Sequence, residues 1–286
     1  MPRRLALALL AALSLVLAPA TGAQARPSQV AAAQQAKPDR ATGWYVALGD
    51  SLAAGYQPGQ GDDKTGGYVG SVLQTLQRTE GKTRLINLGC SGETTTSMVQ
   101  GGRCDYAKGS QLAQAVQVLH AHAKHVRLVT IDIGANDVGG CLGQSGIDMA
   151  CITTSLTTVS QNLPRILAQV HAAAPQAQVV VLNYYNPYLA AWLLGPSGQQ
   201  TAQQSAVLQQ VLNAIIAMSA MIHGAQVADV ATAFRSSDWT PVATPLGQLP
   251  TNVATICSLT WMCTRADIHT NDAGYAVLAQ AVVARL

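Results

Sequence analysis

The sequence predicts an α/β fold, a parallel sheet with helices on both faces, from two observations. Short apolar runs that end at a glycine or a polar residue alternate with longer segments whose apolar residues recur every three or four positions. The alternation continues along the chain, and no segment is repeated. Because strands that alternate with helices form βαβ units, which build parallel sheets, we expect one domain over residues 43–286.

The first half of this domain predicts three strands and two helices. Its first apolar run stops at Gly49, and its second stops at Gly89. Between them Val69, Val72 and Leu76 recur at helical spacing, and an Ala/Gln/Leu-rich segment precedes the third run. In chain order we expect a strand over 44–49, a helix over 68–77, a strand over 84–88, a helix over 111–124 and a strand over 126–133.

The second half predicts two more strands, three helices and one long loop. An apolar VVVL run is typical of a strand buried on both faces. Pro164 predicts a kink or a restart in the helix that contains it. We expect a helix over 152–173, a strand over 178–183, a helix over 201–223, a short strand over 227–230, a proline-containing loop over 234–265 and a final helix over 271–286.

The composition allows a substantial core and argues against a nucleic-acid partner. Of the 286 residues, 49% are hydrophobic and only 11% are charged, and the formal net charge is +3. A chain that binds nucleic acid normally carries a basic patch or stripe, and no basic run follows Arg3–Arg4. We expect a monomer.

Residues 1–25 have the pattern of a secretory signal peptide, in which a basic start precedes a short apolar run and small residues. An uncleaved membrane anchor is the alternative. Residues 26–42 are polar and lack apolar periodicity, which indicates a flexible leader. We therefore expect a secreted protein without a stable membrane anchor once the signal is cleaved.

Six cysteines in an exported chain indicate disulfides. They fall into three pairs that are close along the chain, which predicts Cys90–Cys104, Cys141–Cys151 and Cys257–Cys263. The alternative is a metal cluster, but there is no C-x-x-C spacing and no histidine at ligand spacing from a cysteine pair. We expect no metal and no cofactor.

Four polar segments lie where the predicted strands end or the last helix begins. They contain Ser51, Gly92, Asn136 and His269. Because ligands of open α/β sheets bind beyond the carboxyl ends of the strands, we expect these segments to meet at one edge. A histidine can act as the base for a serine nucleophile, while backbone N–H groups and an uncharged amide can stabilise an oxyanion. By itself, Ser51 is equally compatible with a turn serine.

Four sequence blocks, GDSLAAG, NLGCSGET, IGAND and DIHTNDAGY, occur in this order and together resemble those of the SGNH (GDSL) hydrolase superfamily. The resemblance covers about residues 45–286. It implies a three-layer α/β/α sandwich with a central parallel sheet of about five strands. It also implies Ser51 as nucleophile, His269 as base, and an oxyanion hole formed by the N–H groups of Ser51 and Gly92 and the side chain of Asn136.

One departure from the family pattern concerns the acid of the triad. The family usually has an aspartate three residues before the histidine, whereas position 266 is alanine and Asp267 lies two residues before His269. We expect Asp267 to reach the imidazole if the loop bends. The main-chain carbonyl of Arg265 or Ala266 is the alternative partner.

These residues predict a secreted serine esterase whose substrate is a small-molecule or lipid ester. The same site would serve a lipase, a phospholipase, a polysaccharide O-deacetylase or an acyltransferase, and a non-catalytic binding module is the alternative from another class. The lack of a lid-like amphipathic segment favours an esterase over an interfacial lipase. The aromatic residues at 184–188 are expected either to line an acyl or leaving-group pocket or simply to pack, and Asp50 is expected to brace the turn at Ser51.

Overall fold

The computed structural model describes residues 42–286 except 144 and 145. The predicted signal peptide, residues 1–25, and all but the last residue of the predicted leader, residues 26–42, lie outside this range. In chain order the elements are β1 Gly43–Gly49, α1 Gly67–Glu80, β2 Thr83–Asn87, α2 Thr95–Gln100, α3 Gln111–His122, β3 Val126–Asp132, α4 Ala135–Gly139, β4 Leu142–Gly143, β5 Gly146–Ile147, α5 Met149–Ala173, β6 Gln178–Leu182, the 3-10 helix η1 Pro187–Leu194, α6 Pro196–Ile222, β7 Gln226–Ala228, α7 Val230–Ala233, β8 Pro241–Thr244, β9 Gly247–Pro250, α8 Thr251–Leu259, α9 Met262–Arg265 and α10 Asp272–Val283.

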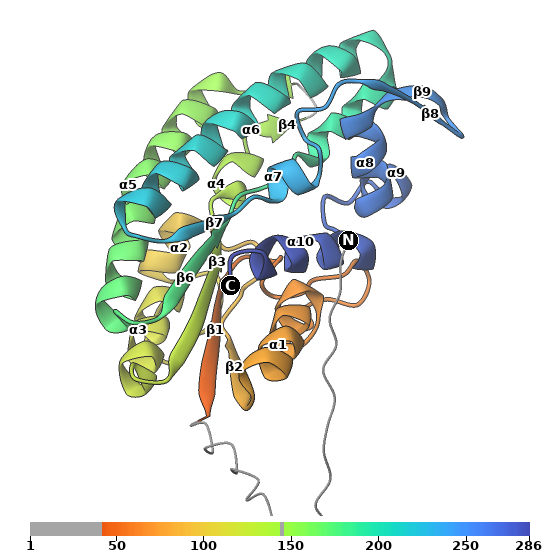
Figure 1. Cartoon of the computed structure of the whole chain (residues 1–286). Helices are drawn as coiled ribbons and strands as arrows, with labels where there is room; N and C mark the ends of the chain where they lie inside the picture. The colour runs from red at the N-terminus through yellow and green to blue at the C-terminus, as the bar shows by residue number, and fades with distance from the viewer. Residues whose placement is uncertain (1–41, 144–145) are drawn as a thin grey trace, which may run out of the picture. The chain divides into compact units, whose positions relative to one another are not determined.

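The main sheet has five parallel strands in the order β2-β1-β3-β6-β7. Helices α3, α5 and α6 cover one face and helices α1 and α10 cover the other (Figure 1). This is the predicted three-layer α/β/α sandwich. The strand order changes direction between β1 and β3, so the segments that follow their carboxyl ends run to opposite sides and leave the crevice where ligands of such sheets bind.

The central strands are apolar on both sides because helices cover both faces of the sheet. In β1 and β3 all residues but one are buried, and in β6 all but the first are buried. Runs such as Val179-Val-Val-Leu182 therefore do not alternate with polar residues, as expected for strands enclosed by two helical layers. The rigid base of this sheet holds the ends of β1 and β3 in place.

Helix α6 is the one helix among the described residues that is long and apolar enough to cross a membrane by length and composition. It contains no charged residue. One side of it, which includes Leu212, Ile216 and Ala220, is buried in the domain, and the helix packs on η1 and α5. A helix that packs on a protein core can have the same hydropathy as a membrane span, and α6 is packed in this way.

The prediction of a loop over 234–265 is wrong. Residues 241–250 form the hairpin β8–β9, and two helices, α8 and α9, follow it. Pro241 and Pro250 lie at the open end of the two-stranded hairpin, where a missing N–H costs little, and Pro250 precedes the first residue of α8. Prolines in this segment therefore mark the ends of short elements.

Several other elements also differ from the sequence-based expectation. Helix α5 runs from Met149 to Ala173 without interruption at Pro164. Helix α2 and the 3-10 helix η1 were not predicted, and α6 begins at Pro196 rather than at 201. Thr94 is the N-cap of α2 and forms a capping box. This signal was missed because the helix has only six residues.

The six cysteines form three disulfides, Cys90–Cys104, Cys141–Cys151 and Cys257–Cys263, the pairs that the sequence predicts. The first joins the segment that follows β2 to the segment that precedes α3. The third joins α8 to α9, directly before the loop that carries His269. Two of the disulfides therefore restrain segments that lead to the sheet edge beyond the carboxyl ends of β1 and β3.

Replacing Cys90 and Cys104 together by alanine is expected to lower the free energy of unfolding by about 3 kcal/mol, because the bond closes a loop between residues 14 positions apart. Urea unfolding of the variant and the wild type, followed by circular dichroism without reductant, measures the change. Equal free energies of unfolding would contradict the prediction.

Candidate active site

The turn after β1 is built on Gly49, which lies against Asp132 at the end of β3. A Cβ atom at position 49 would lie 2.3 Å from the Asp132 carbonyl oxygen, and the backbone φ of +139° is one that L side chains rarely adopt. The N–H of Asp50 then donates to the same carbonyl at 3.0 Å. This close approach makes the chain leave the sheet abruptly, so that Ser51 lies in the turn at the end of β1.

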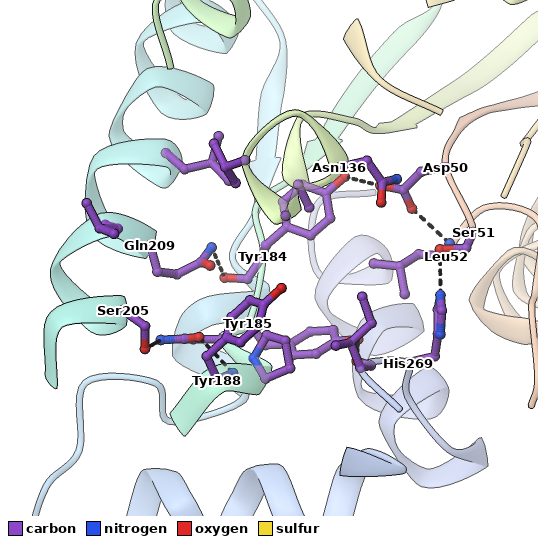
Figure 2. Close-up of a pocket in the computed structure, with 18 of the residues that line it drawn as sticks. Asp50, Ser51, Leu52, Asn136, Tyr184, Tyr185, Tyr188, Ser205, Gln209 and His269 are labelled. Carbon is purple, nitrogen blue, oxygen red and sulfur yellow. Dashed lines mark hydrogen bonds between the residues drawn. The ribbon is translucent and has the colours of Figure 1, made fainter. Parts of the chain in front are cut away.

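Ser51, His269 and Asp267 lie in a hydrogen-bonded line. The Ser51 Oγ is 2.9 Å from the His269 Nε2, and the His269 Nδ1 is 2.7 Å from the Asp267 Oδ1. Figure 2 shows the imidazole pointing at Ser51. Since Asp267 accepts at Nδ1, the neutral imidazole carries its proton there and leaves Nε2 free to accept from the serine.

Asp267 reaches His269 because the chain turns at Ala266. Ala266 ends α9 in the left-handed conformation, at φ 52° and ψ 36°. The Asp267 carboxylate then accepts the backbone N–H of His269 at 2.9 Å, an Asx turn, and the same oxygen contacts Nδ1. The partner of the imidazole is thus the carboxylate and not the main-chain carbonyl of Arg265 or Ala266.

Three donors, on the serine turn and on two segments beside it, lack a full set of protein partners. Within the described part of the chain, the N–H groups of Ser51 and Gly92 donate to no protein atom. Asn136 donates one Nδ2 hydrogen to the Glu93 carbonyl at 2.9 Å, which leaves the second available. The segment that carries Gly92 is held beside the serine turn, because the Cys90 N–H donates to the Gly49 carbonyl at 3.0 Å.

Gln111, at the start of α3, links the serine turn to the Gly92 segment. Its Oε1 accepts the Gly49 N–H at 2.7 Å, and its Nε2 lies 3.0 Å from the Gly49 carbonyl and 2.9 Å from the Glu93 carboxylate. Ser97 also donates to Glu93. Burial raises the pKa of Glu93, and these hydrogen bonds oppose the rise. Gln111 is fully buried, so the link is shielded from water.

Two buried carboxyl groups, Asp50 and Asp132, lie behind the serine turn. Asp50 accepts the Leu52 N–H at 2.9 Å, the bracing role predicted for it. Asp132 accepts the N–H groups of Asp50 and Ala53. Burial raises the pKa of both groups, and the neighbouring charge of Asp50 raises that of Asp132 further. Burial and the like charge nearby thus both disfavour the ionised form of Asp132.

Two consecutive tyrosines after β6 contact both halves of the site. The Tyr184 hydroxyl donates to Asp50 at 2.7 Å, and the Tyr185 hydroxyl donates to the Ile268 carbonyl at 2.8 Å. Because the two tyrosines are consecutive residues after β6, their hydrogen bonds connect the serine turn to the histidine loop. Burial raises the pKa of both hydroxyls, so they remain protonated donors.

A cavity of about 90 Å³ begins at Ser51 and His269 and runs toward α6. In Figure 2 Ser51 and His269 stand at one end, and Ser205 and Gln209 stand on α6 at the other. Most of the wall is apolar and comes from α5, α6 and the segment around α4. These wall residues include Leu52, Val138, Ile152, Leu156, Leu208, Leu212 and Ile268. Tyr184, Tyr185 and Tyr188 also line the cavity, which is one of the two roles expected for residues 184–188.

No group of three or more His, Cys, Asp or Glu side chains among residues 42–143 and 146–286 is arranged to hold a metal ion. The structure joins Ser51, His269 and Asp267 by hydrogen bonds and places Asn136 in the same cavity wall, while Gly92 lies outside that wall, in the segment that Cys90 attaches to the serine turn. Sequence reasoning missed Gln111 and Tyr184 as partners of the serine turn. Gln111 directly follows the N-cap Ser110 of α3 and carries no pattern that points to Gly49.

Comparison with known proteins finds relatives across the domain. Residues 47–277 match the model of the GDSL-like Lipase/Acylhydrolase family. A lipase of Streptomyces rimosus is 32% identical over 209 residues, covering 66% of this chain and 70% of the relative. Lipase 1 of Streptomyces coelicolor is 32% identical over 241 residues, covering 77% and 80%. In fold, the chain is similar to a lipase from a goat rumen metagenome, with a TM-score of 0.55, 17% identity and coverage of 85% and 97%.

Removing the Tyr184 hydroxyl is expected to destabilise the domain. Tyr184→Phe leaves the buried Asp50 carboxyl without one donor, which we expect to lower the free energy of unfolding by about 1–3 kcal/mol. Tyr188→Phe is the matched control, since that hydroxyl has no hydrogen-bond partner in the described part of the chain. Urea unfolding of both variants measures the difference, and equal values would contradict the prediction.

Proposed function

Because the chain belongs to the GDSL-like lipase/acylhydrolase family, we propose that it is a secreted serine esterase that hydrolyses carboxylic esters through an acyl-enzyme. The observation that carries the proposal is the line from Ser51 Oγ through His269 to Asp267, with contacts of 2.9 and 2.7 Å. A nucleophile, a base and an orienting acid in hydrogen-bond contact are the parts that acyl transfer to serine requires. The signal-like N-terminus and three disulfides support secretion.

In the first half-reaction Ser51 Oγ attacks the ester carbonyl carbon while His269 Nε2 takes its proton. Asp267, at Nδ1, stabilises the imidazolium that forms. The carbonyl oxygen becomes an oxyanion, and the N–H groups of Ser51 and Gly92 and the free Nδ2 hydrogen of Asn136 are the donors available to it. When the C–O bond breaks, His269 returns the proton to the departing alcohol.

Water completes the second half-reaction. His269 takes a proton from a water molecule, whose oxygen attacks the acyl carbon, and then returns the proton to Ser51 as the acid leaves. The Tyr56 ring contacts the imidazole in a tilted arrangement, with ring centroids 4.4 Å apart, and limits how far the imidazole can turn between the two steps. The same three donors stabilise the second oxyanion.

The apolar cavity supports esters whose acyl group is a hydrocarbon chain. It starts at Ser51, where the acyl carbon would be attached, and its walls include Leu and Ile side chains of α5 and α6 and Val138 of α4. An acetyl group would leave most of this cavity empty, so a longer acyl chain would gain more from burial. Lipid esters belong to this class, which agrees with the lipases among the relatives.

Ser51→Ala is expected to abolish hydrolysis of a p-nitrophenyl ester, and Asp267→Asn to lower kcat by about 10³–10⁴-fold, because the imidazole would lose its orienting carboxylate. Steady-state kinetics measures both. Labelling of the wild type, but not of Ser51→Ala, by a fluorophosphonate probe separates a catalytic serine from a binding module. Wild-type turnover in Ser51→Ala would refute the proposed mechanism.

Filling the cavity is expected to change the acyl preference. Leu208→Trp places a large ring in the cavity wall, so kcat/KM for p-nitrophenyl hexanoate should fall by about tenfold or more while that for the acetate changes little. Each methylene that the wild type buries is worth about fourfold. Val207→Trp, on the exposed side of α6, is the matched control. A parallel loss for both esters would contradict the acyl role of the cavity.

A further inference from the structure

Arg103 lies directly against the segment that carries Gly92. A Cβ atom at position 92 would lie 2.2 Å from an Nη atom of Arg103 and 2.5 Å from its Cζ, so the guanidinium occupies the side of Gly92 where a side chain would stand. The Nε–H of Arg103 donates to the Ser91 carbonyl at 3.0 Å. Although the residue as a whole is exposed, its charged end is therefore fixed on one peptide group.

The carbonyl of Ser91 and the N–H of Gly92 belong to the same peptide group. In a planar trans peptide these two bonds point in opposite directions. Arg103 holds the carbonyl side, and the Gly92 N–H on the other side donates to no protein atom in the described residues. The guanidinium is thus bound to the carbonyl side of this peptide group. The N–H on the opposite side is the donor to the oxyanion.

We propose that Arg103 is a positioning residue of the oxyanion hole, which orients the Ser91–Gly92 peptide and polarises its N–H toward the developing negative charge. The proposal rests on the proposed esterase function. Hydrogen bonds that share a group strengthen one another, and a charged donor at the carbonyl increases the positive charge on the N–H hydrogen.

The covalent structure keeps Arg103 in this place. The neighbouring Cys104 is bonded to Cys90, which directly precedes Ser91, so the disulfide fastens the two segments next to the contact. Ser91 Oγ donates to Asp62, and the Cys90 N–H donates to the Gly49 carbonyl. The charge of Arg103 acts on Glu93, whose pKa burial raises and this charge lowers, and the Glu93 carboxylate already accepts hydrogen bonds from Ser97 and Gln111.

The nature of the side chain also fits this role. The planar guanidinium can lie flat on a glycine and donate from Nε at its edge, whereas the compact ammonium of lysine cannot do both. Gly92 has a φ of +79° in addition, so glycine is required here for its backbone conformation as well as for the space that Arg103 takes.

The test compares Arg103→Gln, Arg103→Lys and, as a matched control for the loss of one charge, Lys108→Gln in the same loop. For p-nitrophenyl butyrate we expect kcat to fall about tenfold in Arg103→Gln with KM within twofold, less than the 10²–10³ that losing a whole oxyanion donor costs. Arg103→Lys should fall between Arg103→Gln and the wild type, and Lys108→Gln should match the wild type.

A transition-state analogue provides the readout that a purely structural role would not change. A trifluoromethyl ketone forms a tetrahedral oxyanion adduct on the serine, so its Ki should rise in Arg103→Gln by the factor that kcat/KM loses. In Arg103→Ala, millimolar guanidinium should restore part of kcat. An unchanged Ki, or a loss that follows only the thermal stability of the variant, would overturn the proposal.

The outcomes also separate this inference from the function on which it rests. An active wild type with an equally active Arg103→Gln overturns the role of Arg103 and leaves the esterase function intact. A wild type that hydrolyses no ester and takes up no fluorophosphonate overturns the proposed function itself.

Discussion

The close contact between Gly49 and Asp132, where β1 and β3 end, determines where the rest of the site lies. Position 49 has no room for a Cβ beside the Asp132 carbonyl, and that carbonyl accepts the next N–H of the chain. The turn therefore leaves the sheet at a fixed point, and Ser51 follows it in the crevice beyond the carboxyl ends of β1 and β3. Gln111 and Tyr184 then form hydrogen bonds to this turn, whose position is fixed.

The site depends on hydrogen bonds between segments that the sheet alone would leave separate. Asn136 binds the Gly92 segment, Gln111 binds that segment to the serine turn, and Tyr184 and Tyr185 bind the turn and the histidine loop to β6. Most of these groups are buried, so leaving one of them unpaired would be costly. This cost keeps the nucleophile and the base in contact without a substrate.

The sequence predicted the sheet and its flanking helices, and pointed to Ser51 and His269, because hydrophobic periodicity and strand ends are local signals. It could not predict the partners that only folding brings together. Gln111 lies 62 positions from Gly49. Nothing in the sequence distinguishes Arg103 from other surface arginines, and only the structure places its guanidinium on Gly92. The reach of Asp267 depended on Ala266 adopting a positive φ, which is uncommon for alanine and is not written in the sequence. The short helices within 234–265 were missed because the prolines of this segment favour a loop in the sequence.

The Ser51–His269 contact joins residues that are 218 positions apart. Contacts of such long range form late, after the local parts of the sheet and helices have been ordered. During synthesis the serine leaves the ribosome long before the histidine exists, so a growing chain or one cut short before His269 has a nucleophile without a base. Turnover under the proposed function therefore begins only with the full-length folded molecule, and specific activity measures the fraction of complete chains in a preparation.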